Sequence, residues 1–427
     1  MTSPLPDVWP APCPAAPVTN VISLPGSKSL TNRALVLASL AEGASVVRRP
    51  LRSRDTLLMT SALASMGVGV ADDGDDWKIT PAPLNRDAQV DCGLAGTVMR
   101  FLPPVAGLST GTIAFDGDPH MRLRPVGEVL GALTALGMSI DDGGRGALPF
   151  SVRGTGSVPG GTVVIDASAS SQFISALLLA GARYDRGVDI RHDGKPVPSL
   201  PHIEMTIAML QARGVAVDDT DANRWAVAPG PIAALDEAIE PDLSNAAPFL
   251  ALAATTGGSI TVRDWPRHTT QPGDALREVL TQLGCQVTLD DAGLTVSGTG
   301  EIGGIDLDLH EIGELTPAIA ALCALADSPS YLRGVGHIRL HETDRLAALA
   351  VELAKLGADV TERADGLSIR PATLHGGVFS TYADHRMAHA GVIIGSAVEG
   401  VLVEDIATTA KTFPDFAAAW LAAVGGP

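Results

Sequence analysis

The stretch LTQLGCQVTLDDAGLTVSG, residues 280–298, joins the end of an amphipathic helix to a pair of β-strands. Gly284 stands where a helix needs a left-handed residue to end, and Asp290 and Asp291 indicate an acidic turn between the strands. The same pattern recurs at intervals of 70 to 77 residues, around Gly67, Gly137, Gly214 and Gly357. A fixed period of this kind predicts a repeated α/β unit.

A second repeated element is an Ala/Leu-rich helix that follows a polar cluster. Its six copies are GSKSLTNRALVLASLAEG from Gly26, GLAGTVMRFLPPVAG from Gly93, SASSQFISALLLAGA from Ser168, DLSNAAPFLALAA from Asp242, ELTPAIAALCALA from Glu314 and DHRMAHAGVIIGSAVEG from Asp384. Six units of about 70 residues favour two domains of three units. The apolar stretches are expected in the core, and function is expected at the helix N-termini, where free N–H groups favour anions.

Composition indicates a folded chain and argues against two classes of partner. Apolar residues make up 46% of the 427 residues and charged residues 18%, which excludes disorder. The formal net charge of −18 repels nucleic acid and acidic membrane surfaces. We therefore expect no nucleic acid and no membrane as partners, and a small anionic ligand wherever Lys and Arg gather.

The amino-terminal segment MTSPLPDVWPAPCPAAP, residues 1–17, lacks a basic start followed by an apolar run, so it predicts a Pro-rich leader strand or arm and no signal peptide. No apolar run reaches the roughly 18 residues of a spanning helix. The four cysteines have neither CxxC spacing nor a nearby His pair, which argues against disulfides and zinc. We expect a cytoplasmic protein without a bound metal.

Two motifs carry the clearest chemistry. In PGSKSLTNR, Lys28 and Ser29 begin a predicted helix and Arg33 follows one turn later on the same face, which suits an anion, although the spacing of a nucleotide-binding P-loop is absent. In HETDRLAAL, Glu342 stands beside His341 and Arg345 and could act as a general acid or base. Taken alone, the first motif also fits a capped surface helix, and the second also fits a surface ion pair.

Seven motifs together resemble the enolpyruvyl transferase family. They follow family order from Pro25 to Phe416: PGSKSLTNR, LAGTVMR, MRLRP, SASSQF, HETDR, ADHRMA and AKTFPDF. The resemblance implies an α/β fold of two domains, an inverse α/β prism with six βαβαββ-type repeats, three per domain, joined by a double crossover. The implied first domain is discontinuous, residues 1–25 and 241–427, the second is 26–240, and the active site lies in the cleft between them.

The resemblance also implies a reaction. The enolpyruvyl group of phosphoenolpyruvate passes to the 5-hydroxyl of shikimate 3-phosphate through a tetrahedral intermediate, with release of phosphate and without a metal or organic cofactor. Glu314 is expected to take the hydroxyl proton, Glu342 to deliver a proton to the methylene carbon, and Lys28 to assist the leaving phosphate, with roles that can exchange between steps. The resemblance also implies inhibition by glyphosate.

The implied binding residues form two sets. Shikimate 3-phosphate is assigned to Lys28, Ser29, Arg33, Ser170, Ser171, Gln172, Ser199, Glu314 and His341. Phosphoenolpyruvate is assigned to Lys28, Gly96, Arg124, Gln172, Arg345, Arg386 and Lys411. The arginines fit this ligand because they bind carboxylate and phosphate with two parallel hydrogen bonds.

The chain departs from the family pattern at five positions, of which Glu314 and His341 belong to the implied binding sets. Family members commonly have Asn, Asp, Lys, Tyr and Arg where this chain has Leu94, Glu314, His341, His202 and His120. A longer carboxylate arm at Glu314 preserves the expected chemistry, whereas His341 is titratable near neutrality. We expect the basic reaction to survive, with affinity and pH dependence altered.

Two other functions remain open at this stage. One is the sister reaction, in which the acceptor is UDP-N-acetylglucosamine; the loop at Asp116–Pro125 lacks the reactive Cys usual in that enzyme. The other is a non-catalytic repeat scaffold that binds anions. Nothing in the sequence demands more than a monomer.

Overall fold

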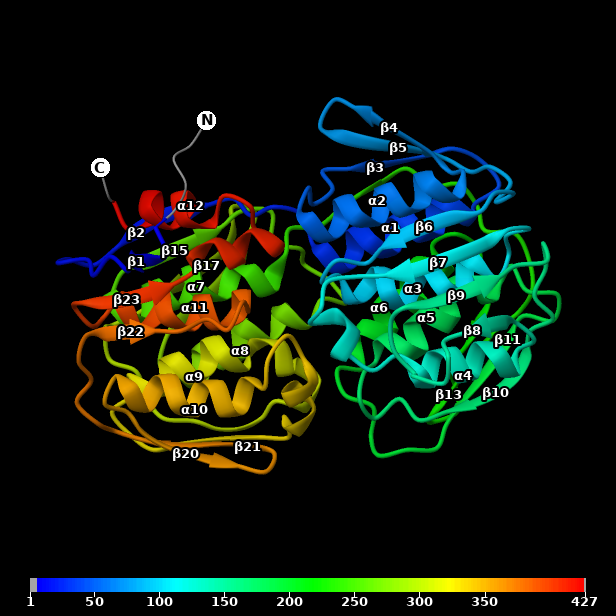
Figure 1. The fold of residues 1–427 in the computed structure, drawn as a ribbon. Coiled ribbons are helices and arrows are strands. Elements are labelled where there is room, and N and C mark those ends of the chain that lie inside the picture. The colour runs from blue at the N-terminus through cyan, green and yellow to red at the C-terminus, as the bar shows by residue number, and fades with distance from the viewer. Residues whose placement is uncertain (1–5, 426–427) are drawn as a thin grey trace. The chain divides into compact units, whose positions relative to one another are not determined.

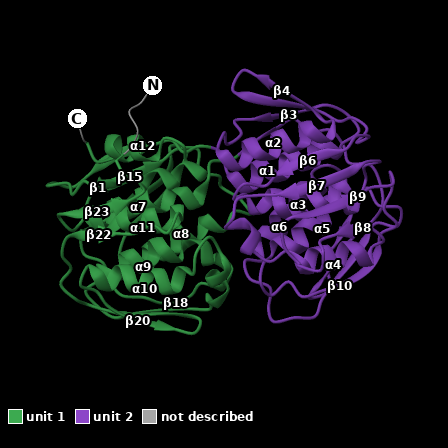
Figure 2. Ribbon diagram, in the orientation of Figure 1, with its two compact units in different colours: residues 1–25, 240–427 green, residues 26–239 purple. Residues whose placement is uncertain are grey.

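The computed structural model describes residues 6–425 and divides into two compact units (Figure 2). Unit 1 takes in the described residues of 1–25 and 240–427, and unit 2 takes in 26–239. Glu240 therefore lies in unit 1, whereas the sequence analysis placed it in the other domain. Each unit has a hydrophobic core of its own, with no residue shared between the two.

Unit 2 contains three repeats of one design (Figure 1). The first comprises α1 (Lys28–Leu40), β3 (Ser45–Arg48), α2 (Arg54–Met66), β4 (Gly69–Asp73), β5 (Asp76–Thr80) and β14 (Glu237–Ala238). The second comprises β6 (Ala88–Asp91), α3 (Gly96–Ala106), β7 (Thr112–Asp116), η1 (Met121–Leu123), α4 (Gly127–Ala135), β8 (Ser139–Asp141) and β9 (Phe150–Arg153). The third comprises β10 (Gly161–Ile165), α5 (Gln172–Gly181), β11 (Val188–His192), α6 (Pro201–Gln211), β12 (Val217–Asp218) and β13 (Arg224–Val227).

Unit 1 contains three more repeats. The first comprises β2 (Thr19–Ile22), η2 (Leu243–Ala246), α7 (Ala247–Thr256), β15 (Ser259–Val262), η3 (Pro272–Ala275), α8 (Leu276–Gln282), β16 (Gln286–Asp290) and β17 (Gly293–Ser297). The second comprises β18 (Asp306–Asp308), η4 (His310–Leu315), α9 (Thr316–Ala324), β19 (Ser330–Arg333), η5 (Gly336–Leu340), α10 (Arg345–Lys355), β20 (Asp359–Arg363) and β21 (Gly366–Arg370). The third comprises β22 (Gly377–Phe379), α11 (His385–Gly395), β23 (Val401–Glu404), η6 (Ile406–Lys411), α12 (Phe416–Ala423) and β1 (Val8–Pro10).

The four-stranded sheets share one strand order. In the second repeat of unit 2 the order is β6-β7-β9-β8, where β6 and β7 run parallel and the hairpin strands β8 and β9 complete the sheet antiparallel. Strand β7 alternates exposed and buried residues, as expected for a sheet with one face on the core. The predicted repeat of a parallel pair followed by a hairpin is thus the unit of the fold.

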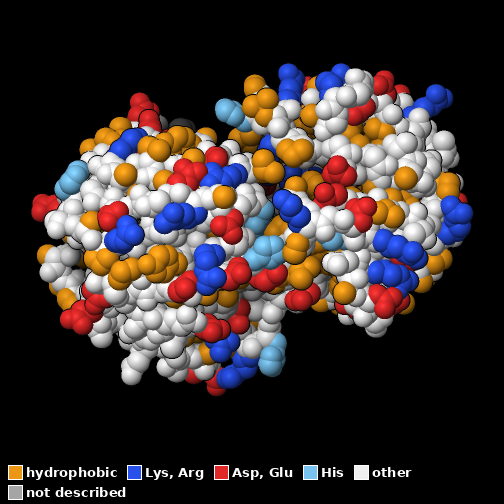
Figure 3. Space-filling view, turned by 90° about the horizontal axis from the view of Figure 1, so that it is seen from below, with side chains coloured by type: hydrophobic (Ala, Val, Ile, Leu, Met, Phe, Trp, Pro, Cys, Tyr) orange, Lys and Arg blue, Asp and Glu red, His pale blue; other side chains and the backbone are white. Residues whose placement is uncertain are grey.

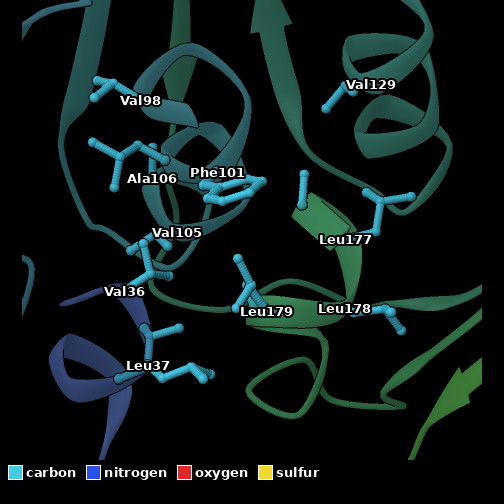
Figure 4. Packing of buried hydrophobic residues seen from close by; sticks show 14 of the residues in the cluster. Val36, Leu37, Val98, Phe101, Val105, Ala106, Val129, Leu177, Leu178 and Leu179 are labelled. Atoms are coloured by element: carbon cyan, nitrogen blue, oxygen red, sulfur yellow. The ribbon is translucent and has the colours of Figure 1, made fainter. Parts of the chain in front are cut away.

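The first helix of each repeat is buried on nearly every side. In α1, every residue from Leu30 to Leu40 is buried, and α3, α5, α7, α9 and α11 show the same pattern. Figure 4 shows how Val36 of α1, Phe101 of α3 and Leu179 of α5 pack together in unit 2. A helix without a polar face must be enclosed, so the sheets lie outside these helices.

The recurring glycines end the second helix of each repeat that has a hairpin. Gly67 follows α2 with a φ of 114° and Gly357 follows α10 with a φ of 97°. Gly137, Gly214 and Gly284 also have positive φ. A side chain at these turns would be strained, which confirms the sequence interpretation of these glycines as helix ends.

The sixth repeat departs from the predicted pattern. Strands β22 and β23 form the parallel pair, but β1 from the amino-terminal segment takes the place of the hairpin and runs antiparallel to β23. The sequence contains only five copies of the helix, glycine and hairpin pattern, so no local hairpin was available here. The predicted leader strand is β1; residues 1–5 of that segment lie outside the described residues.

The structure also bears on two expectations about the chain's class. Among the described residues, no helix combines the length and the apolarity needed to cross a bilayer. All four cysteines are free thiols, and Cys92, Cys285 and Cys323 are buried in the cores.

Helix α11 carries a buried histidine, His389. The His389 ring lies 4.8 Å from the Phe416 ring, centroid to centroid, and neither ring nitrogen has a hydrogen-bond partner within residues 6–425. Burial lowers the pKa of His389 well below its ordinary value, and the charges of Arg386 and Arg345 lower it further. The folded protein therefore holds this imidazole neutral.

We expect His389 to weaken the fold in acid. Below about pH 6.5 the unfolded chain protonates this histidine and the folded chain does not, so the free energy of unfolding falls as pH falls. Between pH 7 and pH 5 the loss amounts to about 2 kcal/mol for one such group. His389→Leu should remove that part of the loss in urea unfolding at the two pH values.

The matched control is His268→Leu, because His268 is exposed. This variant should keep the pH dependence of the wild type. An equal pH dependence in wild type and His389→Leu would contradict the assignment.

Candidate active site

In unit 2, Lys28 is the first residue of α1 and is held by a buried carboxylate. The side chain of Ser27 caps the helix by accepting a hydrogen bond from the Leu30 amide. The Lys28 Nζ atom lies 3.4 Å from Asp55 Oδ2, and Asp55 in the first turn of α2 is 2% exposed. This pair places a cation at the amino end of a central helix, where anions are already favoured.

Arg33 lies one turn further along α1 and is 1% exposed. Its Nε donates to Thr206 Oγ1 at 2.7 Å, and its Nη2 donates to Ser175 Oγ at 3.2 Å. Its Nη1 donates to the carbonyl of Ser29 at 3.0 Å, which confirms that the two residues share a helix face. Arg33 thus joins α1 to α5 and α6, and its assignment to a substrate stays a prediction.

Two arginines approach one point at the start of α3. A methyl group placed on Gly96 would come 3.1 Å from Arg100 Nη1 and 3.2 Å from Arg124 Nη1. Arg100 is held from α5, because its Nη1 donates to Gln172 Oε1 at 2.8 Å. The Nε of half-buried Arg124 has no hydrogen-bond partner within the described chain. Two cations and the free amides of a helix start together suit an anionic group.

The predicted serines of unit 2 lie at the starts of two other helices. Ser171 is buried directly before α5, and Ser170 Oγ accepts from the Gln172 amide at 3.3 Å. Ser199 adopts a φ of 55° just before α6, and its carbonyl accepts from the His202 amide at 3.1 Å. These residues therefore occupy helix starts, as Lys28 and Gly96 do.

In unit 1, a fork between Arg345 and Asp384 organises the predicted site. Arg345 Nε donates to Asp384 Oδ2 at 2.8 Å and its Nη2 donates to Asp384 Oδ1 at 3.1 Å. Asp384 is 0% exposed and also caps α11 by accepting from the Arg386 amide at 2.8 Å. Burial opposes the charge on Arg345, but Asp384 and Glu342 outweigh that effect and raise the pKa of the guanidinium.

Glu342 bridges two of the predicted cations. Its Oε2 accepts from Arg345 Nη2 at 3.1 Å and its Oε1 accepts from Lys411 Nζ at 2.6 Å. His341 contacts the same arginine, with Nδ1 at 2.9 Å from Arg345 Nη1. The HETDR motif is therefore a partly buried network rather than a surface ion pair.

Glu314 joins this group through η2. Its carboxylate accepts a hydrogen bond from the Ser244 hydroxyl, and the Ser244 carbonyl accepts from Arg386 Nη1 at 2.8 Å. Arg386 Nη1 also lies 3.3 Å from Asn245 Oδ1. An unbroken series of contacts therefore connects every predicted site residue of unit 1: Glu314, His341, Glu342, Arg345, Arg386 and Lys411.

The departure at His341 lies in a row of three histidine rings. The His337 ring is 6.0 Å from the His341 ring and 5.7 Å from the His310 ring, centroid to centroid. Burial, followed by the nearby His310, lowers the pKa of His337 to about 4. The ring beside His341 is therefore neutral at physiological pH.

Some organising residues were missed by the sequence analysis. Asp384 stood inside the quoted ADHRMA motif without a role, and its position one residue before the helix was a capping signal. Asp55, Ser244 and Asn245 gave no signal of their own, because their roles depend on contacts between distant segments. Arg100 lies in the quoted LAGTVMR motif but was not assigned to a substrate.

Comparison with known proteins gives matches along nearly the whole chain. A family model for EPSP synthase (3-phosphoshikimate 1-carboxyvinyltransferase) matches residues 13–420. A 3-phosphoshikimate 1-carboxyvinyltransferase of Kocuria rhizophila is 56% identical over 431 residues, which cover 98% of this chain and 97% of the relative. A solved EPSP synthase of Acinetobacter baumannii superposes with a TM-score of 0.81 at 25% identity, covering 97% of this chain and 98% of that chain. A second structure from that organism, at 24% identity and the same coverage, has a TM-score of 0.79 and supports the fold.

Gly96→Ala should weaken binding of the anion at the start of α3. The added methyl group would push both guanidinium groups by a few tenths of an ångström, because their Nη1 atoms lie 3.1 and 3.2 Å away. We expect KM for phosphoenolpyruvate to rise about tenfold, the scale of one disturbed charged hydrogen bond. Gly131→Ala in α4 is the control, since a methyl group there meets nothing within 4 Å; an equal rise in both variants would contradict the assignment.

Arg345→Lys should disrupt the network of unit 1 although it keeps the charge. A lysine cannot fork onto Asp384 and reach Glu342 at once. We expect kcat/KM for phosphoenolpyruvate to fall at least about a hundredfold, since buried Asp384 would lose one of its two charged hydrogen bonds or Glu342 would lose its own. Steady-state kinetics checks this, with Arg277→Lys as the control, since Arg277 is a half-exposed arginine of α8 that pairs with Asp274 outside this network; activity close to the wild type would count against the fork.

Proposed function

The chain belongs to the EPSP synthase family, and on that premise we propose that it transfers the enolpyruvyl group of phosphoenolpyruvate to the 5-hydroxyl of shikimate 3-phosphate. The products are 5-enolpyruvylshikimate 3-phosphate and inorganic phosphate, and the reaction serves the shikimate pathway to chorismate and the aromatic amino acids. The name of the Kocuria relative supports this acceptor over UDP-N-acetylglucosamine. The two substrates are small anions, consistent with the six lysines and arginines among the fourteen assigned binding residues.

The observation that carries the proposal is the connected network in unit 1. Three cations, Arg345, Arg386 and Lys411, lie in one series of contacts with the carboxylates of Glu314 and Glu342. Addition to phosphoenolpyruvate requires cations for a phosphate and a carboxylate and two groups that move protons. Arg345 and Lys411 meet Glu342 directly, so the arriving anions would compete with this carboxylate for the same two cations.

The chemistry proceeds by addition and elimination. In the first step Glu314 takes the proton of the 5-hydroxyl group while the oxygen of that hydroxyl bonds to the central carbon of phosphoenolpyruvate. Glu342 gives a proton to the methylene carbon. In the second step Glu342 takes a proton back from the resulting methyl group as the carbon–oxygen bond to phosphate breaks, and the proton held by Glu314 leaves with the phosphate. Lys28, held beside Asp55, stabilises the charge on the departing phosphate.

Unit 2 supplies the other binding groups in this proposal. Gly96, Arg124 and Gln172 gather at the starts of α3 and α5 and would hold phosphoenolpyruvate together with the cations of unit 1. Ser29, Arg33, Ser170, Ser171 and Ser199, with Glu314 and His341 of unit 1, would hold shikimate 3-phosphate. Each unit would thus contribute binding groups for both substrates. We propose a monomer, because one chain provides every group that the reaction needs. We also propose a cytoplasmic location.

Release of inorganic phosphate from phosphoenolpyruvate tests the proposal. Release should require shikimate 3-phosphate and should not occur with UDP-N-acetylglucosamine as the acceptor. Glu342→Gln and Lys28→Ala should lower kcat by at least about a hundredfold, the scale of a lost acid, base or charge stabiliser.

Glu278→Gln is the matched control, since Glu278 is exposed on α8 and should leave kcat unchanged. Release with the UDP-sugar alone would keep the reaction type and overturn the acceptor. Specific binding of both anions without any release would support the scaffold reading instead.

A further inference from the structure

The loop that carries Asp384 has an unfavourable backbone. It links β22 to α11, and within it Tyr382 and Ala383 adopt φ values of 55° and 56°. Residues with a side chain rarely occupy this left-handed region, and two in succession cost free energy at each position. Contacts from outside the loop must therefore hold it in place.

Glu352 of α10 provides those contacts from a fully buried position, since the residue is 0% exposed. Its Oε2 accepts from the Ser380 amide at 2.9 Å and its Oε1 accepts from the Tyr382 hydroxyl at 2.6 Å. Lys355 Nζ also donates to Oε1, at 2.7 Å from a half-exposed side chain. One buried carboxylate thus binds both the backbone and the side chain of the strained loop.

Helix α10 also contacts the other end of the loop, at Asp384. Arg345 and Glu352 are seven residues apart on α10 and so lie on one face, two turns from each other. Arg345 forks onto Asp384 while Glu352 holds Ser380 and Tyr382. Asp384 in turn caps α11 at Arg386. The loop is therefore fixed at two points to the helix that begins with a predicted substrate-binding residue.

We propose that Glu352 and Tyr382 are positioning residues for the arginines that bind phosphoenolpyruvate. They hold the left-handed loop in place and thereby fix the position of Asp384. Asp384 in turn orients the Arg345 side chain and caps the start of α11, where Arg386 lies. Neither residue is assigned to a substrate. This inference rests on the proposed function and names an additional layer of the same site.

Steady-state kinetics on Tyr382→Phe is the principal test, because this variant removes one hydroxyl and keeps the ring. We expect KM for phosphoenolpyruvate to rise about tenfold, with kcat within about twofold of the wild type, because binding groups are displaced while the proton-transfer groups remain. Glu352→Ala should raise KM further, and Glu352→Gln should restore much of the affinity, since an amide can accept from Ser380 and donate to Tyr382.

A second variant distinguishes this role from plain packing. Ala383→Gly, added to Tyr382→Phe, should bring KM back toward the wild-type value, because glycine adopts a positive φ without strain. Lys355→Ala is the control: it removes a half-exposed partner of the same carboxylate and should leave KM unchanged.

The outcomes separate the two proposals. A wild type that releases no phosphate overturns the proposed function and this inference with it. An active wild type with an unchanged KM in Tyr382→Phe overturns the inference alone, as does a lowered melting temperature without a change in KM. A higher KM that Ala383→Gly reverses supports it.

Discussion

The central helices have no polar face, and this constraint determines where the protein can do chemistry. Helices α1, α3 and α5 of unit 2, and α7, α9 and α11 of unit 1, are buried along almost their whole length. Their sides are closed to a polar ligand, and so only their ends can meet one. Lys28, Gly96, Gln172 and Arg386 lie at the amino ends, where backbone amides are free and the helix dipole favours anions.

In each unit, carboxylates pair with the cations that are predicted to bind the substrates. Glu342 accepts hydrogen bonds from Arg345 and Lys411, and Asp384 accepts a pair of hydrogen bonds from Arg345. Asp55 forms an ion pair with Lys28. These buried and half-buried cations therefore do not stand as uncompensated charges. The same pairing lets an acidic chain of net charge −18 keep basic groups ready for anionic substrates. Figure 3 shows acidic and basic side chains interspersed over the visible face of the molecule.

Much of the architecture could be predicted from local chemistry. Glycines with positive φ and fully apolar helices are determined within a few residues of sequence, and both predictions are confirmed. The substitution of β1 for a hairpin in the sixth sheet could not be predicted, because strand pairing depends on partners almost four hundred residues apart. The roles of Asp384 and Arg33 could not be predicted for the same reason, because their partners lie far away in sequence. Asp384 accepts from Arg345 of α10, and Arg33 donates to side chains of α5 and α6. The motifs identified the chemistry, whereas the contacts that fix each side chain arise from tertiary packing.

Strand β1 has a consequence for how the chain is made. Val8–Pro10 pairs with Val401–Glu404, and β2 pairs with β15 at Ser259–Val262, so the first strands to be synthesised have no partner until much later. Unit 2 is different, because every strand of its sheets lies between residues 26 and 239. The middle of the chain can therefore complete its sheets on the ribosome while the amino-terminal strands remain unpaired. Strand β1 can complete its sheet only after β23 has been synthesised.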